Sequence, residues 1–66
     1  MCEVNAYLLK DGKEWLLLEK VYKLETTDDQ IHIENLFGEQ KFVNLSLKEI
    51  DFDRNRLVFV EPEEVP

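Results

Sequence analysis

Residues 2–20 read CEVNAYLLKDGKEWLLLEK, two extended runs joined by an Asp-Gly pair. In the first run every second side chain falls on one face, and these side chains are Cys2, Val4, Ala6 and Leu8. That period of two residues predicts a strand. Asp11-Gly12 tolerates the positive φ values of a two-residue hairpin turn, so residues 14–20 are expected to return beside the first strand. Apolar residues on both phases of Trp15 to Leu18 indicate that a closed barrel or a partner covers the second face.

Polar turns divide the rest of the chain into further extended runs. The runs are residues 30–37, 41–47 and 56–61, and the turns are residues 26–29, 38–40 and 53–55. Residues 21–25 either continue the preceding strand or begin another after a bend, and residues 48–52 are ambiguous, since one short helical turn would also fit. The Leu-rich residues 14–22 would suit a helix, but the chain has no capped helical stripe of adequate length, so the strand interpretation is preferred.

Five or six short strands without a long connection predict an all-β fold, a small antiparallel five- to six-stranded barrel of the SH3-like or Sm-like type. Residues 1–61 are expected to form a single β domain, and residues 62–66, with two prolines and two acids, a flexible acidic tail. A domain of this size buries only about 60% of its unfolded surface. A single cysteine cannot close an intrachain disulfide, so we expect a homodimer to supply the missing stability.

Composition excludes several classes of protein. The chain carries 8 basic and 15 acidic residues, a net charge of −7, which repels phosphate backbones and attracts cations. Nucleic acid is therefore not the expected partner. No apolar stretch approaches the ~20 residues that cross a bilayer, and the first residues lack the regions of a signal peptide. The protein is expected to be cytoplasmic and not membrane-bound, with its single thiol reduced.

Motifs of enzymes are missing from the sequence. The two glycines, Gly12 and Gly38, do not form a phosphate-binding loop, and no Ser-His-Asp or Cys-His spacing suggests a nucleophile. The many carboxylates are the normal solvated surface of an acidic protein. The sequence therefore predicts that the protein is not an enzyme.

Cys2 is a candidate metal ligand because of its position. The terminal amine, the amide nitrogen between residues 1 and 2 and the Cys2 sulfur can form two fused five-membered chelate rings on one metal, with Met1 supplying backbone nitrogen. If Met1 is removed, the Cys2 amine and thiolate still chelate. Nitrogen and thiolate donors in a plane suit Ni(II) or Cu(II), whereas Zn(II) prefers a tetrahedral set. The alternative is that Cys2 is a small buried hydrophobic residue at a strand start.

His32 is the only imidazole of the chain and so must be considered as a second candidate ligand. It lies on the polar phase of its predicted strand, where a single histidine is more often simply exposed. The aromatic residues are expected in the core or at a subunit interface, in preference to a base-stacking surface.

Five short motifs together resemble one known family. They are Met1-Cys2-Glu3, Asn5-Ala6-Tyr7-Leu8, Lys10-Asp11-Gly12, Asn35-Leu36-Phe37-Gly38-Glu39 and Lys48-Glu49-Ile50-Asp51. They look like the CooT family of small accessory proteins linked to nickel insertion into carbon monoxide dehydrogenase, and the resemblance runs from residue 1 to about residue 60. It implies a homodimeric, β-rich, Ni(II)-binding protein whose metal depends on the cysteine after the initiator Met, here Cys2.

Two classes of function therefore remain. The first is a Ni(II)-binding accessory protein that delivers or stores nickel for maturation of a metalloenzyme such as carbon monoxide dehydrogenase. The alternative is a non-metal interaction module that binds RNA or another macromolecule, since the CooT family has also been labelled predicted RNA-binding. The lysines are scattered among acids and form no basic stripe, so the nickel hypothesis is preferred.

Overall fold

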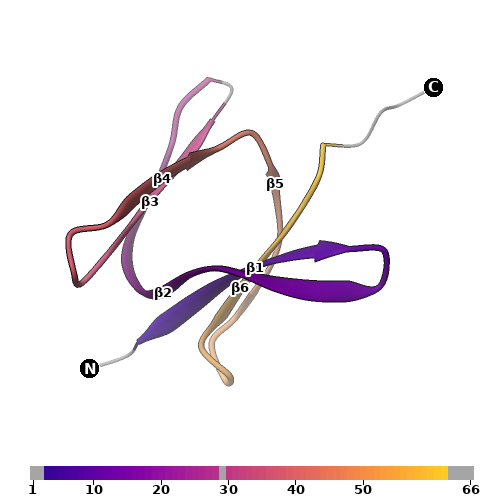
Figure 1. Ribbon diagram of the computed structural model, residues 1–66, viewed down its shortest axis with the longest axis horizontal. Helices are drawn as coiled ribbons and strands as arrows, with labels where there is room; N and C mark the ends of the chain where they lie inside the picture. Colours follow the sequence, from indigo (N-terminus) through magenta and orange to yellow (C-terminus); the bar gives the residue numbers. More distant parts are fainter. Residues whose placement is uncertain (1–2, 29, 63–66) are drawn as a thin grey trace.

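The computed structural model describes residues 3–28 and 30–62, and these residues form one six-stranded sheet (Figure 1). The strands are β1 (Val4–Lys10), β2 (Lys13–Thr26), β3 (Ile31–Asn35), β4 (Gln40–Val43), β5 (Ser46–Asp51) and β6 (Arg56–Val60). Their order in the sheet is β4-β3-β2-β1-β6-β5. The predicted all-β class is confirmed. Within the described ranges, no helix is long and apolar enough to cross a membrane.

The first hairpin follows the sequence closely. Asp11 and Gly12 have φ values of 55° and 75°, as a two-residue turn of this kind requires, and Lys10 lies opposite Lys13. Residues 21–25 continue the same strand: the first half of β2 pairs with β1, and the second half pairs with β3. A bulge separates the two halves, where Lys20 takes a φ of 57°. The bend at Lys20 lets one long strand serve two parts of the sheet.

The sheet is strongly curled. β4 and β5 lie at opposite ends of the strand order, yet only Asn44 and Leu45 connect them. In a flat sheet these strands would lie about 24 Å apart, because neighbouring strands are ~4.8 Å apart. The backbone from Val43 to Ser46 spans at most about 11 Å. The sheet must therefore bend round on itself, and Figure 1 shows the strands following a ring.

The predicted sheet was wholly antiparallel, and this is wrong at one pair: β1 and β6 are parallel, with Asn5 opposite Arg56 and Leu8 opposite Phe59. The reason is that β4 and β5 run one after the other in the same direction. The chain therefore reverses four times, after β1, β2, β3 and β5, and an even number of reversals returns it to its first direction. Within the described ranges β4 and β5 do not pair, so the sheet is open and a barrel of the SH3-like or Sm-like type is not confirmed.

The core lies on the concave face of the curled sheet. The buried residues that pack together are Ala6, Leu18, Val21, Ile31, Ile33, Leu57 and Phe59. Ala6, Ile33 and Phe59 are fully buried. Val4 and Leu8, predicted on the same face as Ala6, are half-buried, whereas Cys2 lies outside the described residues. The tail expected from residue 62 onward is described only at Pro62.

Candidate functional site

The start of β1 is held on both sides. Asn5 donates its backbone N–H to the carbonyl of Asn55 at 3.1 Å, and its side-chain Oδ1 accepts the backbone N–H of Lys20, also at 3.1 Å. These bonds tie β1 to the turn before β6 and to the bulge in β2. The start of β1 is therefore fixed within the sheet. Met1 and Cys2, the predicted nickel ligands, precede this point and lie outside the described residues.

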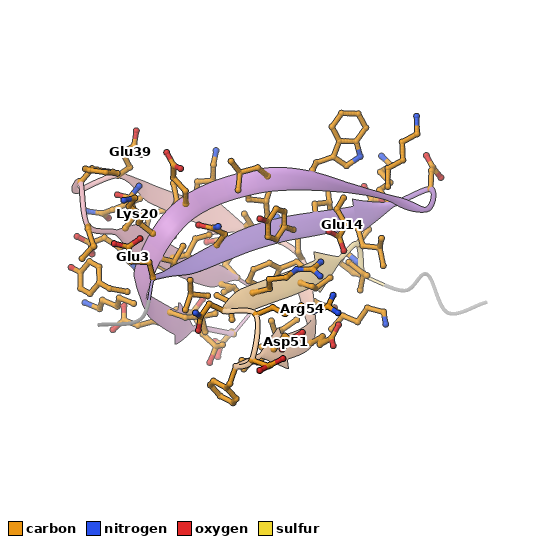
Figure 2. The ribbon with its side chains drawn as sticks, turned by 90° about the horizontal axis from the view of Figure 1, so that it is seen from below. Glu3, Glu14, Lys20, Glu39, Asp51 and Arg54 are labelled. Atoms are coloured by element: carbon orange, nitrogen blue, oxygen red, sulfur yellow. The ribbon has the colours of Figure 1, made fainter. Side chains whose placement is uncertain are left out.

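Lys20 joins three segments around this point. Its backbone carbonyl accepts the N–H of Leu36 at 3.0 Å, and its Nζ lies 3.5 Å from Oε1 of Glu3 and 5.9 Å from the centre of the Phe37 ring. Glu3 and Lys20 lie together at one end of the molecule in Figure 2. Glu3 is the described residue next to Cys2 in sequence, and its carboxylate is paired with the Lys20 ammonium.

The turn between β3 and β4 is organised by Asn35, which the sequence analysis named only as part of a family motif and not as a site residue. Asn35 is 1% exposed. Its Oδ1 accepts the N–H groups of Phe37 and Glu39, at 3.0 and 2.8 Å, and its Nδ2 donates to Oε1 of Glu39 at 2.7 Å. An Asn that precedes a Gly turn was the available signal, since Asn side chains often bond the backbone two residues further on. Asn35 therefore holds the loop in the conformation that places the Phe37 ring near the Lys20 ammonium.

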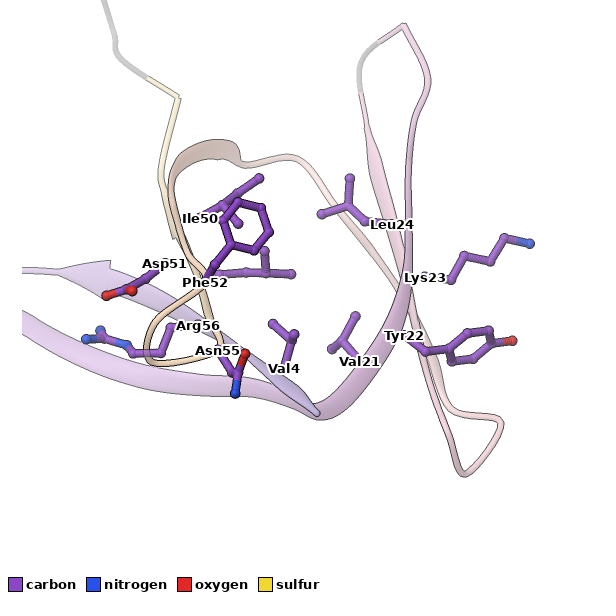
Figure 3. A pocket seen from close by; sticks show the side chains of 11 residues that line it. Val4, Val21, Tyr22, Lys23, Leu24, Ile50, Asp51, Phe52, Asn55 and Arg56 are labelled. Carbon is purple, nitrogen blue, oxygen red and sulfur yellow. The ribbon is translucent and has the colours of Figure 1, made fainter. Parts of the chain in front are cut away.

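An apolar cavity of about 230 Å³ opens between β2 and the end of β5. Val4, Val21 and Leu24 line one side, and Ile50 and Phe52 the other (Figure 3). The cavity exists because the curled sheet does not close. No sequence pattern predicted it, since its walls come from segments far apart in the chain.

Tyr22 and Phe52 also line this cavity, with the Tyr22 ring directed away from it (Figure 3). Phe52 is 83% exposed, the most exposed of the large hydrophobic residues described. Partial desolvation of the hydroxyl, and then the Glu34 carboxylate beside it, raise the pKa of the Tyr22 phenol above its ordinary value.

His32 on β3, the weaker candidate ligand, lies in a small cluster with side chains from the neighbouring strands β2 and β4. Its Nδ1 is 3.3 Å from Oε1 of Glu25, its Nε2 is 3.0 Å from Oε1 of Gln40, and its ring stacks on Phe42 with 4.4 Å between centroids. Its side chain is only 13% exposed, so the expectation that it is simply exposed is wrong. Glu25, His32 and Phe42 meet because they are in register across three strands. Both ring nitrogens already face oxygen atoms of the protein.

The other aromatic residues divide between core and surface. Phe59 is buried and Tyr7 half-buried, as expected of core residues. The exposed ones are Trp15, Tyr22, Phe37, Phe42 and Phe52. For these the core assignment is wrong, because strand edges and turns place them outside the curled sheet, and a subunit interface stays a prediction.

Charged residues form pairs across the surface. The cations of Lys10, Lys20 and Lys23 lie 3.2, 3.5 and 3.9 Å from Glu61, Glu3 and Glu25, and Arg56 bonds Glu14. Arg56 also stacks over the ring of Tyr7, with 5.2 Å to the centroid. Within residues 3–28 and 30–62, no three residues of the His, Cys, Asp and Glu types are grouped closely enough to hold a metal ion.

Comparisons with known proteins identify the family and the fold of the chain. The model of the family described as CO dehydrogenase accessory protein CooT matches residues 1–60. A crystal structure of a protein assigned as a CooT from Carboxydothermus hydrogenoformans superposes with a TM-score of 0.87 at 31% sequence identity, covering 94% of this chain and all of that one. Among curated proteins, none matches the chain. The match extends over nearly the whole folded part, and this chain belongs to the CooT family of CO dehydrogenase accessory proteins.

Proposed function

We propose that the protein binds Ni(II) as cargo through the Cys2 thiolate and serves in this way as an accessory protein in maturation of carbon monoxide dehydrogenase. The observation that carries the proposal is that the single thiol of the chain stands at position 2, inside the stretch that matches a family of CO dehydrogenase accessory proteins. A thiolate with adjacent backbone nitrogens is a donor set that suits Ni(II). The net charge of −7 favours approach of a cation.

The fold supports this role by anchoring Glu3 and Asn5, which follow Cys2 in sequence. Asn5 is bonded to both neighbouring segments, and Glu3 is paired with Lys20. A short N-terminal segment on such an anchor can bring its donors to one metal with little loss of chain entropy. The protein is also proposed to act as a homodimer, in which two Cys2 thiolates shared at a two-fold axis would bind one metal per dimer, whereas separate sites would bind one per chain.

The alternative function, RNA binding, gains no support from the surface. Half of the eight basic side chains, those of Lys10, Lys20, Lys23 and Arg56, are each matched by a carboxylate, and the others are scattered among acids in the sequence. A groove for single-stranded RNA needs cations free to follow the phosphates, with aromatic side chains between them. The acidic surface is better matched to a metal ion than to a nucleic acid.

Titration of Ni(II) into wild type, Cys2→Ser and His32→Ala tests the proposal. Wild type should show a thiolate-to-metal absorption band, and Cys2→Ser should lose that band and bind at least ~100-fold more weakly, since one thiolate and its chelate ring are lost. His32→Ala should bind like wild type. Binding should weaken below neutral pH, because a thiol with a pKa of roughly 8.5 and an amine of about 7.7 must lose protons.

The outcomes separate the candidate sites. Tight binding by Cys2→Ser would show that Cys2 is not the essential ligand. Loss of binding in His32→Ala alone would move the site to the β3 cluster of Glu25, His32 and Gln40. The stoichiometry distinguishes a shared site from two separate ones.

A further inference from the structure

The turn between β3 and β4 presents two apolar side chains to solvent. Leu36 is 47% and Phe37 63% exposed, although turns are usually built from small and polar residues. We propose that this loop, residues 35–39, is the surface that docks on the metalloenzyme receiving the nickel, at an apolar pocket of that enzyme bordered by Arg and Lys side chains. The inference rests on the proposed function and names the docking surface and the chemistry of the partner's.

Hydrogen bonds hold the loop in one conformation. Oδ1 of the buried Asn35 accepts the N–H groups of Phe37 and Glu39, at 3.0 and 2.8 Å. The N–H of Leu36 donates to the carbonyl of Lys20 at 3.0 Å. The backbone beneath the two exposed side chains is therefore tied to both β2 and β3. A preorganised loop of this kind loses little conformational entropy when a partner binds.

The two exposed side chains do not serve the core. Among the described residues, neither Leu36 nor Phe37 belongs to the core cluster or to the half-buried side chains packed against it. Their burial therefore contributes little to the stability of the isolated chain. Aromatic residues are enriched in the buried centres of protein interfaces, where a few side chains supply most of the binding energy. The rigid support beneath exposed apolar groups thus indicates a binding surface.

The loop stands beside the start of the chain. The Lys20 ammonium lies 5.9 Å from the centre of the Phe37 ring and 3.5 Å from Oε1 of Glu3, which directly follows Cys2 in sequence. Figure 2 shows Glu3, Lys20 and Glu39 together at one end of the molecule. An enzyme docked on the loop would therefore meet the same end of the molecule as the segment proposed to carry nickel, as transfer of the metal requires.

The charges around the loop select the kind of partner. Glu34 and Glu39 flank its apolar residues, and neither carboxylate is paired with a cation within the part of the chain that the structure describes. The Lys20 ammonium is matched by Glu3. The loop thus has the same sign of charge as the whole chain, which carries −7. A second copy would bring like charges together, whereas a basic surface would be attracted.

Binding to purified, nickel-free CO dehydrogenase tests the proposal, with the dissociation constant measured by biolayer interferometry on metal-free proteins. Phe37→Ser should weaken binding at least about ten-fold, as truncation of an aromatic residue at the centre of an interface does. Leu36→Ser should weaken it about three-fold, since less apolar area is lost. Trp15→Ser is the matched control, because it removes an aromatic side chain that is 55% exposed on the first hairpin. It should stay within about two-fold of wild type.

A charge reversal tests the basic character of the partner. Glu34→Lys should weaken binding about five-fold, because it repels the cations around the pocket. Glu49→Lys on β5 makes the same change in net charge and should stay within about two-fold of wild type. Glu39 is left intact, because its side chain accepts a hydrogen bond from Asn35. Circular dichroism checks that each variant is folded.

The outcomes separate this inference from the proposed function. If Phe37→Ser and Glu34→Lys bind the enzyme like wild type, or if wild type does not bind it at all, the loop is not the docking surface, and the nickel titration of Cys2→Ser stands on its own. If Phe37→Ser changes only the self-association seen by sedimentation, the loop is an interface between copies and the inference is wrong. If Cys2→Ser binds nickel as tightly as wild type while Phe37→Ser fails to dock, the docking surface is upheld and the Cys2 site is wrong.

Discussion

β4 and β5, the two strands at the ends of the sheet, both leave backbone hydrogen-bonding groups unpaired along one edge, but they differ in length and regularity. Both have an unpaired edge within the described chain. β4 has four residues and no bulge in its pairing with β3. If two copies paired through β4, the two-fold axis between them could pass only through a residue of this strand. An axis at Lys41 would place two lysines opposite each other, and an axis at Phe42 would place Lys41 opposite Val43. Phe42, moreover, stacks on His32.

The edge of β4 is thus short and carries a lysine, as solvent-exposed edges of monomeric proteins usually are. β5 has six residues, and its pairing with β6 shifts at a bulge between Leu47 and Glu49. An edge strand is therefore not in itself a binding surface. The pairing register that its backbone allows decides whether its side chains can meet those of a partner strand.

The largest effect is expected from the buried residue beside each edge. Phe59 lies opposite Leu47 of β5 and Ile33 opposite Lys41 of β4, and both are fully buried. Phe59→Ala should cost about 3–5 kcal/mol and Ile33→Ala about 2–4 kcal/mol, from lost burial and the cavity that remains. A chain of this length has a total stability of only about 3–10 kcal/mol. We therefore expect Phe59→Ala to be largely unfolded.

Urea denaturation followed by circular dichroism measures both variants. The two losses of stability are then compared. We expect the loss to be larger for Phe59→Ala, on the β5 side of the sheet, than for Ile33→Ala, on the β4 side. An Ile33→Ala variant less stable than Phe59→Ala would reverse that conclusion.

An intermediate effect is expected at Asn35, which holds the turn leading into β4. Asn35→Asp places a second carboxylate 2.7 Å from Oε1 of Glu39, where Nδ2 now donates a hydrogen bond. At pH 7 the cost should be about 2–4 kcal/mol, from the lost bond and the repulsion between like charges. Two adjacent carboxylates raise the pKa of one of them in the folded state above its unfolded value of about 4.

The sign of the pH dependence follows from that shift. A pKa raised on folding gives stability that is present below about pH 4 and is lost as the pH rises through the raised value. The deficit of Asn35→Asp should therefore shrink on acidification, whereas that of Asn35→Ala, with no charge to titrate, should stay near 1–3 kcal/mol. Denaturation of both variants at pH 4 and pH 7 checks this. A pH-independent deficit in Asn35→Asp would mean that the two side chains move apart.

What the sequence predicted well was local. Asp11-Gly12 defined its hairpin because both residues tolerate positive φ. The alternation placed Ala6 on the buried face of β1, although the neighbouring residues of both phases are half-buried. The parallel pairing of β1 with β6 was missed because it depends on the number of reversals along the whole chain. Residues 41–47 were expected to form one strand, whereas they contribute to both β4 and β5 with a break at Asn44-Leu45.

The candidate site shows the same limit. Cys2 could be proposed from sequence because its donors are consecutive atoms of one chain, so no fold is needed to bring them together. The surroundings of His32 could not, because Glu25, Gln40 and Phe42 meet it only through the register of three strands. The contacts of Lys20 with Glu3 and Phe37 depend on the bulge in β2, which no residue type announces, since Lys rarely takes a positive φ.

The smallest effect concerns the left-handed backbone conformation of Lys20, which Asn55 shares. Lys20, in the strand that supports β3 and β4, has a φ of 57°, and Asn55, in the turn that precedes β6, has a φ of 56°. The left-handed conformation costs a residue with a Cβ about 1 kcal/mol, less for Asn, and costs Gly almost nothing. Lys20→Gly relieves that strain but also loses the side-chain contacts with Glu3 and Phe37. These exposed contacts are worth about 0.5 kcal/mol each, so the net change should be close to zero.

Lys20→Ala separates the two terms, because it loses the same contacts and keeps the strain. We expect Lys20→Gly to be about 1 kcal/mol more stable than Lys20→Ala. At Asn55, Gly should exceed the wild type by only a few tenths of a kcal/mol, because Asn already tolerates this region. Urea denaturation of the four proteins gives these differences. If Lys20→Gly were no more stable than Lys20→Ala, the bulge would not impose the left-handed conformation in solution, and the bend that lets β2 serve both sides of the sheet would need another cause.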